Sequence, residues 1–515
     1  MYKQYKNNLH NEIIVSVFAI LLSITAIILT CDIQIEKGLV SRIFITNFLV
    51  ILSLFFRFFL QLIFSKKINL IPCIKILSPL LFWLFFVYSP IYIKALLSII
   101  GIIGIVVKSF SQFKAIFSAY YLIIPFIYFV IIGSEIWNVH RTPLPCNYLI
   151  MESQTGSDLT FFSAITSILK TYGICSIGID GLISFPYHFG THFFLASLSS
   201  FLDLNPLYIN HVIAPLILLP LSLFIILELF IKFKHLITES FDSNSSKLKF
   251  RDHLILASIL TTLINAPFGL PFVSNLSFFT SPFQIDSQLL GNLLIGVIIV
   301  IISQTRYQNN MSFIITMFFL IFLQSILSIT KSSTSHLSLI IIIYTYFRYS
   351  FQRTTSQNKL WFLSLLLCSM STFYINSLIT TTNLNREGFL TIGFFDLWES
   401  FVPLREWHWI YFSNGFYTFA SFVLMTFIKR DISNLDILLR FKNSKFNLLE
   451  VISVLTFIAI SLSAVFKGSL SFASTYYIDT AKFISFILLA ACISELFSRI
   501  RLCNFNFILF LKTNS

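Results

Sequence analysis

Long apolar runs recur along almost the whole of this chain, and they constrain its fold more than any other feature. Its residues are 56% hydrophobic and 11% charged, whereas about 25% charged residues is typical of a soluble globular domain. A run of about 20 apolar residues is long enough to cross the hydrocarbon core of a bilayer as an α-helix. We therefore expect an all-α polytopic membrane protein.

Hydropathy predicts about 14 transmembrane helices. They are expected at 13–31, 42–64, 70–88, 91–107, 115–133, 207–231, 254–270, 287–303, 312–330, 337–350, 360–380, 410–428, 448–466 and 480–497. About five of these lie in an N-terminal part, 1–133, and about nine in a C-terminal part, 207–515. A large outer loop, 134–206, separates the two parts. The first run is long for a signal peptide and lacks a small-x-small cleavage site, so we expect it to be a retained helix.

The basic residues predict the orientation. If the N-terminus is cytoplasmic, most of the 35 Lys and Arg residues fall in cytoplasmic connections, as the positive-inside rule requires. Both termini are then cytoplasmic. The long polar loops 134–206, 266–286, 381–409 and 467–479 lie on the outer face. Because the basic residues are dispersed at the ends of spans, the net charge of +13 is not interpreted as a nucleic-acid site.

The outer loop 134–206 is expected to contain two surface helices. Apolar residues at helical spacing after Asp158 predict an amphipathic helix at the membrane surface, which Ser157 or Asp158 would cap and Gly173 would end. A second helix is predicted to begin after Pro186 and to continue up to Asp203. It would place His188 and His192, four residues apart, on one face.

Acidic and histidine side chains gather in this loop and make it the candidate active site. Asp158 is either a general base or metal ligand, or a helix cap. Glu135 and Glu152 are further carboxylates for acid–base or Mg²⁺/Mn²⁺ chemistry, although no DxD motif is present. His188 and His192 are expected to bind substrate, to ligate a metal, or to line a polar outward cavity.

The loop 381–409 is the second candidate. Arg386 and Arg405 could bind a phosphate or pyrophosphate through their guanidinium groups, with His408 beside them. The tryptophans of this loop suit either sugar stacking or an interfacial aromatic belt. Elsewhere, Cys146 and Cys175 either form a disulfide on the outer face or remain two thiols.

The run SDLTFFSAITSILKTYG, followed by SFPYHFGTHFFLASLSSFLDLNPLYINHVIAPLILLPLSLF, resembles the GT-C superfamily of multi-span glycosyltransferases. These enzymes use polyprenyl-phosphate-linked sugars, and an acidic residue in an outer loop opens a surface helix. The resemblance implies that Asp158 is the catalytic base or the metal-binding acid, and that His188 and His192 lie near the donor or acceptor path. This chain departs from the pattern in two ways. About five spans precede the loop, and Phe161 and Phe162 replace a histidine.

The leading hypothesis is glycosyl transfer on the outer face of a bacterial inner membrane. The donor would be a polyprenyl-phosphate sugar, the acceptor a glycan, lipid or protein, and the cofactor either none or a divalent cation held by Asp158. An O-antigen-type polymerase or ligase is the second enzyme possibility. A lipid-linked saccharide flippase and a purely structural membrane subunit are the other readings.

Overall fold

The structure is a computed structural model that describes most of the predicted helices. The described residues are 10–31, 38–64, 71–116, 157–176, 189–239, 286–304, 310–350, 353–380, 390–392, 417–425, 447–468 and 475–513. The predicted spans 115–133, beyond residue 116, and 254–270 lie outside them. So do most of the loop 381–409 and the loop residues 134–156 and 177–188.

Nearly all of the described elements are helices. They are α1 (His10–Cys31), α2 (Leu39–Phe64), α3 (Ile71–Tyr88), α4 (Ile91–Ile116), α7 (Ser157–Tyr172), α8 (Gly190–Leu202), α9 (Pro206–Tyr208), the π-helix η4 (Ile209–Ile213), α10 (Ala214–Glu239), α13 (Asp286–Gln304), α14 (Asn310–Thr330), α15 (Ser332–Tyr349), α16 (Thr355–Thr380), α20 (Leu448–Val465) and α21 (Thr475–Thr513). Residues 417–425 are also helical. Two three-residue strands, β1 (Leu390–Ile392) and β2 (Phe466–Gly468), pair antiparallel.

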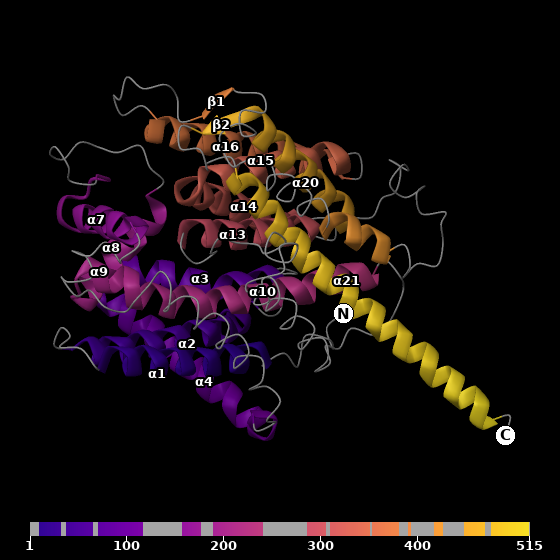
Figure 1. Ribbon diagram of the computed structural model, residues 1–515, viewed down its shortest axis with the longest axis horizontal. Helices are drawn as coiled ribbons and strands as arrows, with labels where there is room; N and C mark the ends of the chain where they lie inside the picture. The colour runs from indigo at the N-terminus through magenta and orange to yellow at the C-terminus, as the bar shows by residue number, and fades with distance from the viewer. Residues whose placement is uncertain are drawn as a thin grey trace. The chain divides into compact units, whose positions relative to one another are not determined.

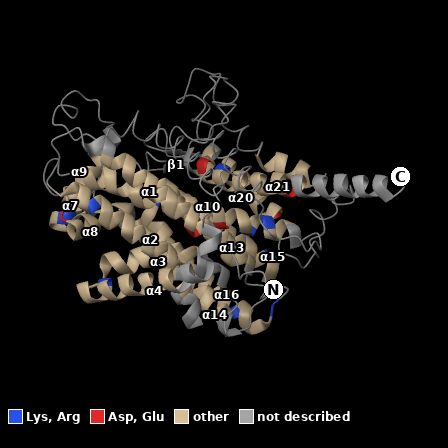
Figure 2. Ribbon diagram, turned by 90° about the horizontal axis from the view of Figure 1, so that it is seen from below, with Lys and Arg blue, Asp and Glu red and all other residues tan. Residues whose placement is uncertain are grey.

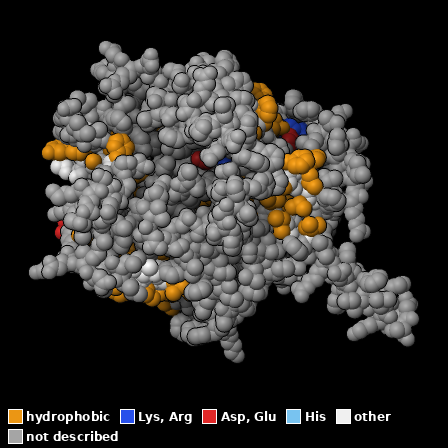
Figure 3. Space-filling model, in the orientation of Figure 1, with side chains coloured by type: hydrophobic (Ala, Val, Ile, Leu, Met, Phe, Trp, Pro, Cys, Tyr) orange, Lys and Arg blue, Asp and Glu red, His pale blue; other side chains and the backbone are white. Residues whose placement is uncertain are grey.

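The apolar helices indicate a membrane-embedded protein. In the part of the chain that the structure describes, four helices contain a segment long and apolar enough to cross a bilayer: Leu39–Phe56, Ala214–Ile237, Phe313–Thr330 and Tyr477–Leu496. Large apolar side chains also face outward, such as Ile91, which is 80% exposed, and Phe457, which is 72% exposed. Most of the described side chains visible in Figure 3 are hydrophobic, and the ribbons of α2 and α3 carry few charges along their length (Figure 2). The expectation of a helical membrane protein is met at this level, while the number of spans stays a prediction.

The chain divides into two compact units, and the first contains the N-terminal helices. It comprises Met1–Ile226, Ser281–Leu339 and Lys359–Arg386. Within it α2 packs against α1, α3 and α4, and α13 packs against α14. Figure 1 shows α7, α8 and α9 gathered at one end of these long helices. Helix α8 contacts α3, α13 and α14, so it joins the outer-loop segment to the apolar helices.

Two glycines allow α4 to lie close against α2. A Cβ atom at Gly104 would come within 2.7 Å of the backbone oxygen of Phe55, and one at Gly101 within 3.0 Å of the Leu52 side chain. Small residues at this spacing let helix backbones approach closely, which is a main source of packing energy between helices in a bilayer.

The second unit is held together by buried polar contacts. It comprises Leu227–Thr280, Ile340–Asn358 and Glu387–Ser515. The Glu450 carboxylate accepts hydrogen bonds from the hydroxyl of Tyr344 at 2.5 Å and from Nε of Arg348 at 2.7 Å. The strands β1 and β2, which sequence analysis did not predict, join the loop 381–409 to the start of the loop 467–479. The placement of both loops on the outer face stays a prediction.

We predict that Gly104→Ala destabilises the protein by about 1–3 kcal/mol, because the added Cβ meets backbone rather than a flexible side chain. Helix propensity alone would give the opposite sign, since Ala is about 1 kcal/mol better than Gly in a helix interior. Thermal unfolding in detergent would measure the change. Ile103→Ala is the matched control, because Ile103 is 44% exposed on the same helix. A Gly104→Ala protein as stable as the parent would contradict the close packing.

Candidate functional site

Helix α7 forms where the sequence predicted the first outer-loop helix. It begins at Ser157 and ends at Tyr172, and Gly173, with φ +70°, follows it. The amide of Gly173 donates to the Leu169 carbonyl at 3.0 Å, which closes the last turn. The apolar face of α7 was expected to lie on the membrane. Its residues Ile165 and Leu169 pack against Ala196 of α8.

Helix α8 begins later than predicted, which corrects one expectation. Its first residue is Gly190, and Phe189 is its N-cap. His188 precedes this helix and lies outside the described residues, so the face that it was predicted to share with His192 stays a prediction.

Helices α7 and α8 run in the same direction. The rings of Phe162 and His192, near the starts of the two helices, lie 5.1 Å apart. At the other ends, Nζ of Lys170, in the last turn of α7, donates to the carbonyl of Leu204, just after α8, at 3.3 Å. The N-terminus of α7, where Asp158 is the second residue, consequently lies at the same end as Gly190.

His192 is a buried, neutral histidine. Its side chain is 4% exposed. Burial lowers its pKa to about 4, and the positive charge of Lys331 contributes to the same shift. At neutral pH the imidazole is therefore uncharged, and it can serve a polar ligand through hydrogen bonds rather than through charge.

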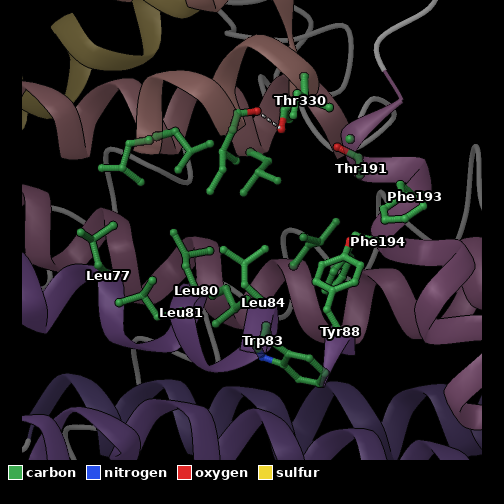
Figure 4. A pocket seen from close by; sticks show the side chains of 18 of the residues that line it. Leu77, Leu80, Leu81, Trp83, Leu84, Tyr88, Thr191, Phe193, Phe194 and Thr330 are labelled. Atoms are coloured by element: carbon green, nitrogen blue, oxygen red, sulfur yellow. Dashed lines mark hydrogen bonds between the residues drawn. The ribbon is translucent and has the colours of Figure 1, made fainter. Parts of the chain in front are cut away.

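A cavity of about 400 Å³ lies directly beside this segment, within the first unit. Helices α3, α8, α10, α13 and α14 line it (Figure 4). Its wall is almost wholly apolar and includes Leu80 and Leu84 of α3 and Phe194 of α8. Figure 4 shows Thr191 and Thr330 at one end and Leu77 toward the other. The polar atoms of the wall are thus concentrated where α8 begins.

Sequence reasoning missed Lys331, which lies at this polar end. It is the single residue between α14 and α15, and it is only 2% exposed. It follows Thr330 of the cavity wall, and its charge acts on His192. The sequence did offer a signal. Lys331 stands alone between two apolar runs, and the Ser and Thr residues at 332–335 after it are of the type that starts helices.

The remaining predicted site residues lie outside the described residues. They are Glu135, Glu152, His188, Arg386, Arg405 and His408, together with Cys146. Asp158 is placed only as a residue of α7. Cys175 is a free thiol packed against the α7–α8 core, and burial raises its pKa to about 11. Among the described residues no three His, Cys, Asp or Glu side chains form a metal-binding group.

We predict that the buried, neutral His192 makes stability pH-dependent. Its folded pKa lies below the ordinary 6.5, so the unfolded chain takes up the proton first. The free energy of unfolding is therefore unaffected by this group above about pH 6.5. It falls, by at most about 3 kcal/mol, as the pH drops toward 4. His192→Gln should flatten this part of the profile, measured as the unfolding midpoint in detergent from pH 7 to 4. Identical profiles for the two proteins would show that His192 is not buried as described.

Comparisons with protein-family models, with curated proteins and with solved structures find no match to this chain. The function must therefore be inferred from the chemistry of the site itself. Its elements are an apolar cavity, a polar end formed by Thr191 and Thr330, a buried Lys331 and a neutral His192.

Proposed function

We propose that the chain is a membrane glycosyltransferase that takes its sugar from a polyprenyl-phosphate donor. The observation that carries this proposal is the apolar cavity beside α8. A volume of about 400 Å³ falls in the range of small-molecule sites, about 300–1,000 Å³. A wall of leucine, isoleucine and aromatic side chains suits an isoprenyl or alkyl chain, because it offers few partners to polar groups.

The α7–α8 segment supports a reaction at one end of the cavity. The starts of the two helices lie at the same end, and Thr191 at the start of α8 lines the cavity. Asp158 is four residues before Phe162, or about 6 Å along the helix axis, and Phe162 contacts His192. A carboxyl group in this region would be close to the head of a lipid whose chain occupies the cavity.

The proposed chemistry needs one base and one stabilised leaving group. Asp158 would accept the proton of the acceptor hydroxyl as its oxygen bonds to the anomeric carbon of the sugar. The bond from that carbon to the phosphate oxygen breaks, and the polyprenyl phosphate leaves with the electron pair. A positive charge near the leaving phosphate would stabilise this step. A divalent cation, Arg386 and Arg405 are the predicted sources of that charge.

Replacing Asp158 by Asn tests the catalytic role separately from the structural one. Asn caps helices about as well as Asp, so the fold of α7 should be kept while the base is lost. We expect sugar transfer from polyprenyl-phosphate donors by purified protein in liposomes to fall at least about 100-fold, with donor binding unchanged. Ser157→Ala is the control for helix capping. Full transfer activity in Asp158→Asn would refute the assignment of Asp158 as base.

Filling the cavity tests whether it holds the lipid. Leu84→Trp should reduce the affinity for a polyprenyl-phosphate donor about tenfold or more, because the indole occupies the space of the chain. Leu96→Trp on α4 is the matched control, since Leu96 is 54% exposed and is not part of the cavity wall. Equal losses in both variants, or none in either, would count against this cavity. Movement of the donor across liposomes without a covalent product would instead favour the flippase.

A further inference from the structure

We propose that the lipid enters the cavity sideways from the bilayer, between α3 and α8, and that the stacked rings of Tyr88 and Phe193 form the gate through which its chain passes. This inference rests on the proposed function and deepens it, because it gives the lipid donor an entry route and an orientation. The head of the lipid would stay at the end of the cavity that holds Thr191.

The wall of the cavity is open to its surroundings at Tyr88 and Phe193. These two side chains line the cavity and are 46% and 44% exposed, whereas the other residues of the wall are buried or half-buried. Their rings are stacked, with centroids 5.6 Å apart and planes 15° from parallel. A chain that enters the cavity at this point must therefore pass these two rings.

Two further aromatic pairs hold α8 against α3 and frame the gate. The ring centroids of Trp83 and Phe194 lie 6.3 Å apart, those of Phe86 and Phe201 lie 5.2 Å apart, and both pairs meet edge to face. Trp83 and Phe86 are buried, and the edge-to-face arrangement is a favourable one for aromatic rings. Exposed side chains change rotamer readily. The exposed pair can therefore separate while the buried pairs keep α8 in place.

The depth of the cavity matches one leaflet of a bilayer. Tyr88 is the last residue of α3, and Leu77 of the wall lies about 16 Å away along the axis of the same helix. Figure 4 shows Tyr88, Phe193 and Thr191 toward one end and Leu77 toward the other. Because the hydrocarbon core is about 30 Å thick, a chain that enters at the end of α3 and reaches Leu77 spans about half of it. The occupant is therefore the chain of one lipid, drawn from the leaflet at the α8 end.

The surface outside the gate is apolar, so the gate opens toward lipid. Phe85 shares a face of α3 with Tyr88 and is 55% exposed. Tyr92, in the first turn of α4, is 69% exposed. Large apolar side chains on such a surface suit contact with acyl chains, and tyrosine rings are enriched where a membrane meets water. The gate is therefore expected at the level where lipid chains join their headgroups.

A buried hydroxyl group beside the gate points independently to a ligand. Thr191 lines the cavity and is 2% exposed. Its hydroxyl oxygen has no hydrogen-bond partner among the described residues, although buried hydroxyls are normally satisfied. Thr191 and Phe193 belong to the first turn of α8, which the Phe193 amide closes by donating to the Phe189 carbonyl at 2.7 Å. An oxygen at the end of the lipid chain would satisfy the Thr191 hydroxyl once the chain has passed the gate.

The test measures the dissociation rate and the affinity of a fluorescent polyprenyl phosphate on the full-length protein in liposomes. Dissociation is followed by adding excess unlabelled lipid, and affinity by titration. We expect Phe193→Ala to raise the dissociation rate about three- to tenfold, the range that one stacked aromatic pair allows. The affinity should change much less, because a gate limits entry and exit alike.

Three variants accompany this one. Tyr88→Ala should act like Phe193→Ala, and Tyr88→Phe, which keeps the ring, should leave the dissociation rate unchanged. Phe85→Ala is the matched control, because Phe85 is exposed on the same face of α3 and is not part of the cavity wall. Tyr88→Ala decides the question by itself if Phe193→Ala does not fold.

Each outcome separates the gate from the proposed function. If removing either ring leaves the dissociation rate unchanged, or if the affinity falls by the same factor as the rate rises, the gate is refuted while the lipid cavity stands. If the parent protein does not bind polyprenyl phosphate, the proposed function fails as well. If an ordinary phospholipid competes equally with polyprenyl phosphate, the cavity holds a bulk membrane lipid and the donor assignment is overturned.

Discussion

The close approach of α8 to α14 at Gly190 is the contact on which the site depends. Any other side chain there would bring its Cβ to 2.9 Å from a methyl carbon of Ile329 and to 3.1 Å from that residue's backbone. The two helices would then have to move apart. Their contact places Thr191 beside the end of α14 and lets the charge of Lys331 act on His192. The absence of a side chain at Gly190 therefore allows α8 to pack closely against the end of α14.

A buried hydrogen-bond network holds the junction behind this contact. Nε2 of Gln324 donates to the carbonyl and the hydroxyl of Ser335, both at 3.0 Å, and to Oγ1 of Thr372 at 2.9 Å. It therefore joins α14, α15 and α16 one turn away from Lys331. Hydrogen bonds between helices have few competitors in an apolar environment, where water is scarce. The same device recurs in the second unit, where the hydroxyls of Thr418, Thr456 and Ser485 contact one another.

The sequence predicted the parts of this structure that local physics determines. Apolar runs of spanning length predicted helices such as α2, α13 and α14 close to their observed bounds. The capping residue Ser157 and the helix-ending Gly173 predicted the two ends of α7. It failed where tertiary contacts decide. The close fit of Gly190 against α14 at the start of α8 is a tertiary contact that no local pattern reveals. The strands β1 and β2 are too short to show a period. Lys331 looked like an ordinary loop lysine, because its burial arises from helices distant in the chain.

The arrangement also explains why a neutral histidine is useful beside a buried lysine. A charged imidazole at His192 would repel Lys331, and burial makes that charge costlier still. As an uncharged group, His192 can hydrogen-bond to a polar ligand without repelling Lys331. The parallel course of α7 and α8 then brings the start of α7, with Asp158, to the same end. In the glycosyl transfer that we propose, Asp158 would act there as the base.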